Sequence, residues 1–106
     1  MSPNQALPTD FEVIRRTVTI VNERGLHARA AAKFVKLIDG FDAAVSVERG
    51  GTSVDGRSIM GLMMFGAGPG TELQLIASGP QAEAAMTALA DLIARGFDED
   101  ISFPAA

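Results

Sequence analysis

The single histidine of the sequence, His27, begins a segment with helical periodicity, and Arg29 follows two residues later. A neutral imidazole is a nucleophile able to form a covalent intermediate. A helix N-terminus attracts anions through its free N–H groups and its dipole, and a guanidinium donates paired hydrogen bonds to phosphate oxygens. The spacing therefore suits a phosphoryl acceptor. A surface histidine with a local hydrogen bond is the more common origin of such a pattern, so these two residues alone leave both interpretations open.

Other kinds of active site lack the residues they need. The sequence has no cysteine, and one histidine cannot supply a nitrogen-rich metal shell, so we expect neither a metal nor a cofactor. No Gly-x-Ser-x-Gly elbow is present. The formal charge of −4 and the absence of tyrosine and tryptophan argue against a nucleic-acid partner. We therefore expect a partner other than DNA or RNA.

A second group of residues begins at Ser58, which precedes a short apolar run. A serine there is a good helix N-cap, worth about 1 kcal/mol, and this is the default interpretation. The functional alternative is a phosphorylation switch beside an apolar surface. The methionine-rich run suits adaptable protein contacts, although its residues could also fill the core. We expect partner docking through Arg24, Ile59, Met60, Leu62, Met63 and Phe65.

The elements that position these residues follow from periodicity and from turn residues. Pro80 suits a first helical turn, and Gly40 and Gly96 suit helix ends. The order β-α-β-β-α-β-α with short connections predicts an α+β fold, with an antiparallel four-stranded sheet and the helices on one face. The expected elements are a strand at 16–21, a helix at 27–39, strands at 44–48 and 52–54, a short helix at 58–65, a strand at 71–77 and a helix at 80–95.

The length of 106 residues predicts one domain. We expect a flexible N-terminal extension at 1–12, the domain at 13–96 and a loose C-terminal tail at 97–106. The sequence shows neither a signal-peptide pattern nor an apolar run of about 20 residues, so we expect a soluble, cytoplasmic protein without membrane insertion.

Two motifs, GLHAR at 25–29 and GRSIMGL at 56–62, together with the element order, resemble the HPr family of phosphocarriers in the bacterial phosphotransferase system. The resemblance runs from about residue 17 to residue 96. It implies an open-faced β-sandwich in which His27 accepts phosphate on Nδ1 from enzyme I and passes it to an enzyme IIA. It matches Arg29 to the active-site arginine, and Ser58 to the serine that an HPr kinase/phosphorylase modifies in some bacteria.

Two points remain open after the resemblance. Ala30 stands where the family's commonest string has proline, and such variants are similar to members that serve nitrogen-regulatory relays. The resemblance implies a phosphoryl carrier with no small-molecule turnover of its own. The alternative is a regulatory binding module that docks through the 59–65 helix and is never phosphorylated.

Overall fold

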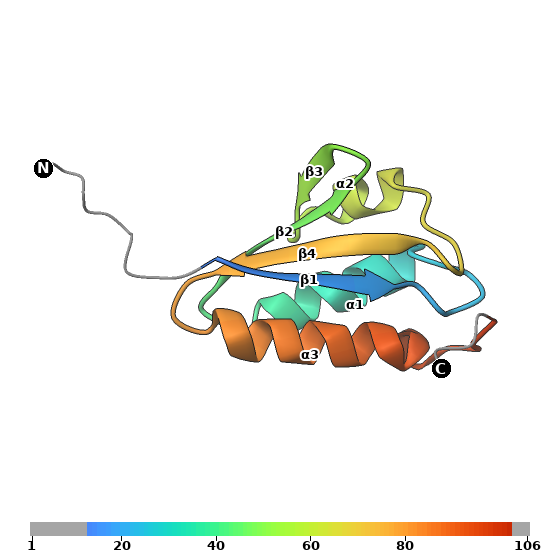
Figure 1. Cartoon of the computed structure of the whole chain (residues 1–106). Coiled ribbons are helices and arrows are strands. Elements are labelled where there is room, and N and C mark those ends of the chain that lie inside the picture. The colour runs from blue at the N-terminus through green and yellow to red at the C-terminus, as the bar shows by residue number, and fades with distance from the viewer. Residues whose placement is uncertain (1–12, 103–106) are drawn as a thin grey trace, which may run out of the picture.

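A computed structural model describes residues 13–102 and confirms the predicted order of elements (Figure 1). One short 3-10 helix, η2, follows the last predicted helix. The elements are β1 (Ile14–Thr19), α1 (Ala28–Ile38), β2 (Ala44–Arg49), β3 (Thr52–Asp55), α2 (Ile59–Met64), β4 (Glu72–Ser78), α3 (Ala82–Ala94) and η2 (Gly96–Asp98).

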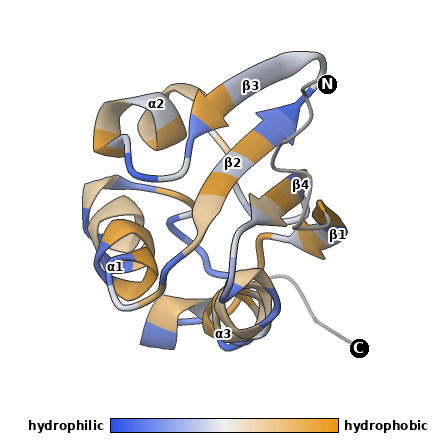
Figure 2. Ribbon diagram, turned by 90° about the vertical axis from the view of Figure 1, so that its left-hand side faces the viewer, coloured by the Kyte–Doolittle hydropathy of each residue, from blue (hydrophilic) through white to orange (hydrophobic). Residues whose placement is uncertain are grey.

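The four strands form one antiparallel sheet in the order β1-β4-β2-β3. β4 therefore lies between β1 and β2, and Leu75 pairs with Arg16 on one side and with Val47 on the other. Figure 2 shows the three helices gathered on one side of this sheet. The predicted α+β architecture, an open-faced sandwich of sheet and helices, is confirmed.

The core lies between the sheet and the long helices α1 and α3. Alternate residues of β4 are buried, as a strand with one covered face requires. Helical spacing places the apolar residues of α1 and of α3 on the helix faces that contact the sheet. The removal of these side chains from water drives the packing. The most completely buried of these residues include Phe34, Ile38, Val47, Leu75, Leu89 and Ile93.

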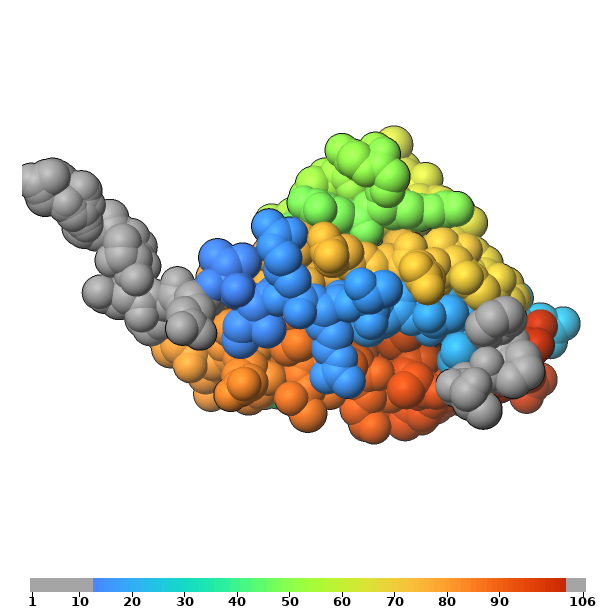
Figure 3. Space-filling view, in the orientation of Figure 1, coloured from blue at the N-terminus to red at the C-terminus, as the bar shows by residue number. Residues whose placement is uncertain are grey.

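Two predicted elements have wrong boundaries. β1 spans Ile14–Thr19 rather than residues 16–21, and it begins earlier because an edge strand keeps its arginine side chains in water while its backbone pairs with β4. Figure 3 shows β1 on the molecular surface, between α3 and β4. Pro80 lies outside α3, since Gln81 is the N-cap with a non-helical backbone. Gln81 is held there by two hydrogen bonds with the backbone of Asp42.

The segment after Gly96, expected to be loose, is docked on the domain as far as residue 102. Phe97 is fully buried although its φ is 55°, a conformation uncommon for a non-glycine residue. The amide of Ser102 donates to the carbonyl of Val21 over 2.9 Å. Residues 97–102 therefore run beside the 20–27 connection (Figure 1). The predicted extension at 1–12 and the end of the tail at 103–106 lie outside the described residues.

Within residues 13–102, the structure contains no helix that is both long enough and apolar enough to span a bilayer.

Candidate functional site

His27 is the N-cap of α1. Its backbone is extended (φ −78°, ψ −178°), and the helix begins at the next residue. The ring atom Nδ1 accepts a hydrogen bond from the backbone N–H of Arg29 over 3.3 Å. Side-chain capping of this kind satisfies one of the free N–H groups at the helix start. Nδ1 therefore faces the positive end of the helix dipole.

The loop before His27 is held by a close backbone approach. Gly25 has φ +68°, and a Cβ at this position would lie 2.2 Å from the carbonyl oxygen of Ala67. The next amide, Leu26 N–H, donates to that same oxygen over 2.9 Å. Glycine is required here both for its positive φ and for the contact. The α2–β4 connection thus fixes where the chain enters α1.

The second ring nitrogen of His27 contacts a residue far away in the sequence. Nε2 lies 2.7 Å from Oε2 of Glu99, which is 72 residues distant. Both side chains are mostly buried, with exposed fractions of 17% and 16%. Because a carboxylate accepts at Nε2 and Nδ1 itself accepts from an amide, the hydrogen-bond pattern assigns the proton of the neutral ring to Nε2. Nδ1 keeps its lone pair.

Glu99 is held by its own partners. The fully buried Asn22 donates from Nδ2 to Glu99 Oε1 over 3.1 Å and to the carbonyl of Gly25 over 2.8 Å. Burial of the Glu99 carboxyl disfavours its ionised form, but hydrogen bonds from Asn22 and then from His27 lower its pKa below the ordinary value of 4.5. Glu99 is therefore a carboxylate at neutral pH.

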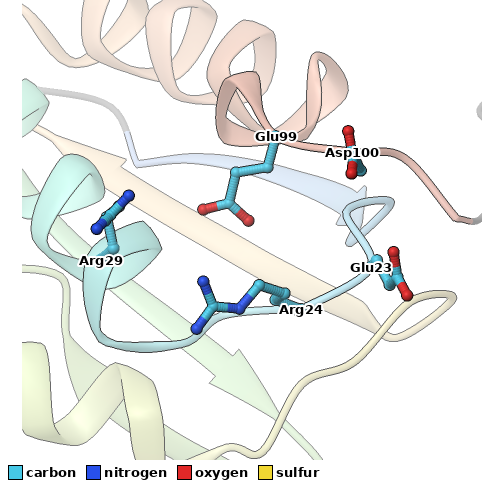
Figure 4. A pocket seen from close by; sticks show the side chains of 5 residues that line it. All are labelled: Glu23, Arg24, Arg29, Glu99 and Asp100. Carbon is cyan, nitrogen blue, oxygen red and sulfur yellow. The ribbon is translucent and has the colours of Figure 1, made fainter.

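A shallow cavity of about 290 Å³ opens beside these residues. Figure 4 shows the guanidinium groups of Arg24 and Arg29 and the Glu99 carboxylate directed into one space. The two guanidinium groups can donate paired hydrogen bonds to an anion, and three carboxyl groups line the same cavity. Arg24, predicted to dock partners, belongs to this cavity. The cavity is lined by Glu23, Arg24, Arg29, Glu99 and Asp100.

Among residues 13–102, no group of three or more histidine or acidic side chains is placed to hold an ion.

Ser58 begins the second predicted site. It is the N-cap of α2, and its Oγ accepts from the backbone N–H of Gly61 over 3.0 Å. The capping role predicted for this serine is confirmed. The hydroxyl group belongs to a half-buried residue, and α2 packs against α1 (Figure 2).

The predicted docking residues of α2 divide into two groups. Met60 is 77% exposed, and Ile59 and Met63 are exposed to a smaller extent. Leu62 is fully buried in the core, and its assignment to the docking surface is wrong. A helix of six residues needs one side chain to anchor it, and Leu62 does so. Phe65 is half-buried against the core.

Met64 lies within the predicted 59–65 docking helix and is 83% exposed, more than Ile59, Met60 or Met63. Glu99, by contrast, escaped the sequence analysis. Glu99 belongs to a run of three acidic residues without periodicity, and nothing local in that run separates it from its neighbours. The one available signal was Phe97, an apolar residue directly after Gly96, which indicates that the chain returns to the core there.

Comparison with known proteins gives consistent matches. A family described as the PTS HPr component phosphorylation site matches residues 14–95. The phosphocarrier protein HPr of Cupriavidus necator is 46% identical over 87 residues, which span 82% of this chain and 98% of that protein. The phosphocarrier protein NPr of Escherichia coli K12 is 40% identical over the same shares. A crystal structure of HPr from Thermoanaerobacter tengcongensis has a TM-score of 0.78 at 40% identity, covering 82% of this chain and 98% of the other.

Proposed function

Because the chain belongs to the HPr family of phosphocarrier proteins of the bacterial phosphotransferase system, we propose that His27 is its phosphoryl-carrying residue. The family implies enzyme I and enzyme IIA as partners in general. In this proposal His27 takes the phosphoryl group from enzyme I and gives it to an enzyme IIA. The observation that carries the proposal is the position of Nδ1, whose lone pair lies at the N-terminus of α1.

The chemistry requires one nucleophile and a positive surrounding for the transferred group. Nδ1 attacks the phosphorus atom, a P–N bond forms, and the bond to the donor breaks with its electron pair leaving on the donor. Arg29 and the first N–H groups of α1 stabilise the negative charge on the phosphoryl oxygens. Arg24, across the cavity, supplies a second guanidinium. No side chain of this protein acts on a small molecule in this scheme.

The test mixes the protein with phosphoenolpyruvate and a matching enzyme I. We expect a mass increase of one phosphate that is lost in acid, because a phosphohistidine is acid-labile. The variant His27→Ala is expected to remain unlabelled, whereas Ser58→Ala serves as a matched control that labels normally. Labelling of His27→Ala would overturn the assignment.

For Ser58 we propose a regulatory role as a phosphate acceptor. The serine caps α2, and the exposed side chains of Met60 and Met64 lie on the same short helix. A phosphate at Ser58 would place nearly two negative charges at the start of this apolar surface and weaken the binding of apolar or acidic partners.

The Ser58 proposal is tested with ATP and an HPr kinase. We expect acid-stable labelling at one site, absent in Ser58→Ala and retained in His27→Ala. The labelled protein should bind enzyme I more weakly than the unlabelled protein. Acid-stable labelling that persists in Ser58→Ala contradicts the proposal.

The exposed surface of α2 also supports the alternative function, a binding module that is never phosphorylated. The two alternatives differ in how partner binding and labelling depend on His27. The binding module predicts no acid-labile label and an unchanged affinity for partners in His27→Ala. The phosphocarrier predicts a label that this substitution abolishes.

A further inference from the structure

We propose that Glu99 is a positioning residue for phosphoryl transfer, which holds the His27 ring with its proton on Nε2 and so presents the lone pair of Nδ1 to the donor. This inference rests on the proposed role of His27 and extends it to a residue outside both sequence motifs. The contact that carries it is the 2.7 Å approach of Glu99 Oε2 to His27 Nε2.

The geometry separates the two edges of the ring. Nδ1 faces the helix N-terminus and accepts from the Arg29 amide, whereas Nε2 faces the carboxylate. A phosphoryl group on Nδ1 would lie on the side of the helix and of Arg29. The Glu99 carboxylate lies at the other edge of the ring, where it accepts a hydrogen bond from Nε2–H. Each edge therefore has the partner that its role requires.

Glu99 is itself held in place, as a positioning residue must be. Its other oxygen accepts from the buried Asn22, which also binds the carbonyl of Gly25 in the loop before His27. Lys33 on α1 binds the carbonyl of Phe97, two residues before Glu99. The carboxylate and the imidazole are thus fixed to the same loop and helix. A surface ion pair formed by chance would have none of these supports.

The transfer step balances without an external acid or base. The neutral ring attacks phosphorus through Nδ1, and the donor leaves with the electron pair of the bond that breaks. The phosphorylated ring keeps its Nε2 proton and becomes cationic, and the adjacent carboxylate stabilises that charge, as an aspartate does for the imidazolium of a serine protease. When an acceptor attacks phosphorus, the P–N bond breaks and its electron pair returns to Nδ1. The proton remains on Nε2 in both directions.

The experiment compares the unmodified protein with Glu99→Ala by ¹⁵N NMR of the one histidine, at about pH 8.5, where an ordinary imidazole is neutral. The unmodified protein should show one protonated and one unprotonated ring nitrogen, assigned to Nε2 and Nδ1. In Glu99→Ala the two shifts should move toward each other. With enzyme I as donor, kcat should fall roughly tenfold or more while KM changes less than about twofold, since one charge-assisted hydrogen bond is lost.

Glu83→Gln is the matched control, because it removes an exposed carboxylate in the first turn of α3, outside the cavity. We expect it to leave the ring shifts and kcat unchanged. Slow hydrogen exchange of the Ser102 amide, which binds the carbonyl of Val21, verifies that the segment stays docked in each variant. If the segment after α3 undocks in Glu99→Ala, the variant Glu99→Gln is used instead. Glutamine keeps an oxygen that accepts from Asn22 but carries no charge, so kcat should still fall.

The outcomes separate this inference from the proposed function. If the unmodified protein is phosphorylated on His27 but the Glu99 variants keep its ring shifts and its kcat, the positioning role is overturned. If the unmodified protein takes no phosphate, the proposed function fails. The NMR comparison of unphosphorylated proteins still decides whether Glu99 sets the ring proton.

Discussion

Lys33, in the middle of α1, donates a hydrogen bond from Nζ to the backbone carbonyl of Phe97 over 2.7 Å, although 64 residues separate the two. The ring of Phe97 is fully buried in the core. The segment that follows α3 is therefore anchored twice, by an apolar ring and by a charged hydrogen bond, two residues before Glu99. The candidate site depends on this anchor as well as on its own motif.

The first prediction concerns Phe97→Ala. Removing a fully buried aromatic ring should lower the free energy of unfolding by about 3–5 kcal/mol, through lost burial and the cavity left behind. Urea denaturation measures the change. Phe41→Ala, which removes a half-buried ring from the loop after α1, should cost clearly less. Equal losses in the two variants would show that Phe97 is not an anchor.

The second prediction concerns pH. The lowered pKa of Glu99 means that its carboxyl binds a proton more weakly in the folded than in the unfolded protein. Its contribution to stability is therefore fully present above the unfolded value near 4.5 and is lost as pH falls through the lower folded pKa. The free energy of unfolding should differ between the unmodified protein and Glu99→Gln at neutral pH, and this difference should shrink on acidification.

Urea titrations at several pH values below 6 measure that difference. The exposed Glu72 on β4 provides the control, because Glu72→Gln removes the same charge away from His27. A difference for Glu99→Gln that grows toward low pH would have the wrong sign and contradict the prediction.

The third prediction uses two glycines of positive φ. Gly25→Ala places a Cβ 2.2 Å from a backbone oxygen, whereas Gly50→Ala places it where nothing lies within 4 Å. Both variants incur the cost of a left-handed alanine, about 1–2 kcal/mol. Gly25→Ala should cost about 3 kcal/mol or more, since the clash also disrupts the bond from Leu26 to Ala67. Thermal unfolding would refute this if the two variants melted alike.

The fourth prediction concerns Arg29 in the proposed transfer. Arg29→Ala keeps the backbone N–H that His27 accepts, so α1 should still form, but the guanidinium is lost from the cavity. We expect the rate of His27 phosphorylation by enzyme I to fall about tenfold to a hundredfold. Rapid-quench kinetics measure it. Lys36→Ala removes a positive charge from the last turn of the same helix and should leave the rate within about twofold.

Local patterns in the sequence predicted most of the fold. Helical spacing predicted α1 and α3, and the glycine pair at 50–51 predicted the turn between β2 and β3, where both residues have positive φ. The boundaries of β1 and α3 were less accurate, because they depend on pairing with β4 and on the contact of Gln81 with Asp42. These are tertiary effects that no short window of sequence contains.

Only the part of the candidate site that lies close together in the sequence was predictable. His27 at a helix start is a local pattern, but its contact with Glu99 spans 72 residues and depends on how the chain turns after α3. The turn uses Phe97 in a left-handed conformation, which residue type does not suggest. Leu62 was misassigned for a different reason. In a six-residue helix composed almost entirely of apolar residues, periodicity cannot identify the buried face.

The capping role of His27 places a chemical condition on anything that bonds to Nδ1. One lone pair serves both as the acceptor for the Arg29 amide and as the ring's nucleophile, so a new bond at Nδ1 leaves that amide without its acceptor. A phosphoryl group brings oxygens that can accept the hydrogen in place of the ring, whereas an alkyl group brings none. The first turn of α1 should thus tolerate a phosphoryl group on Nδ1 and penalise alkylation of the same atom.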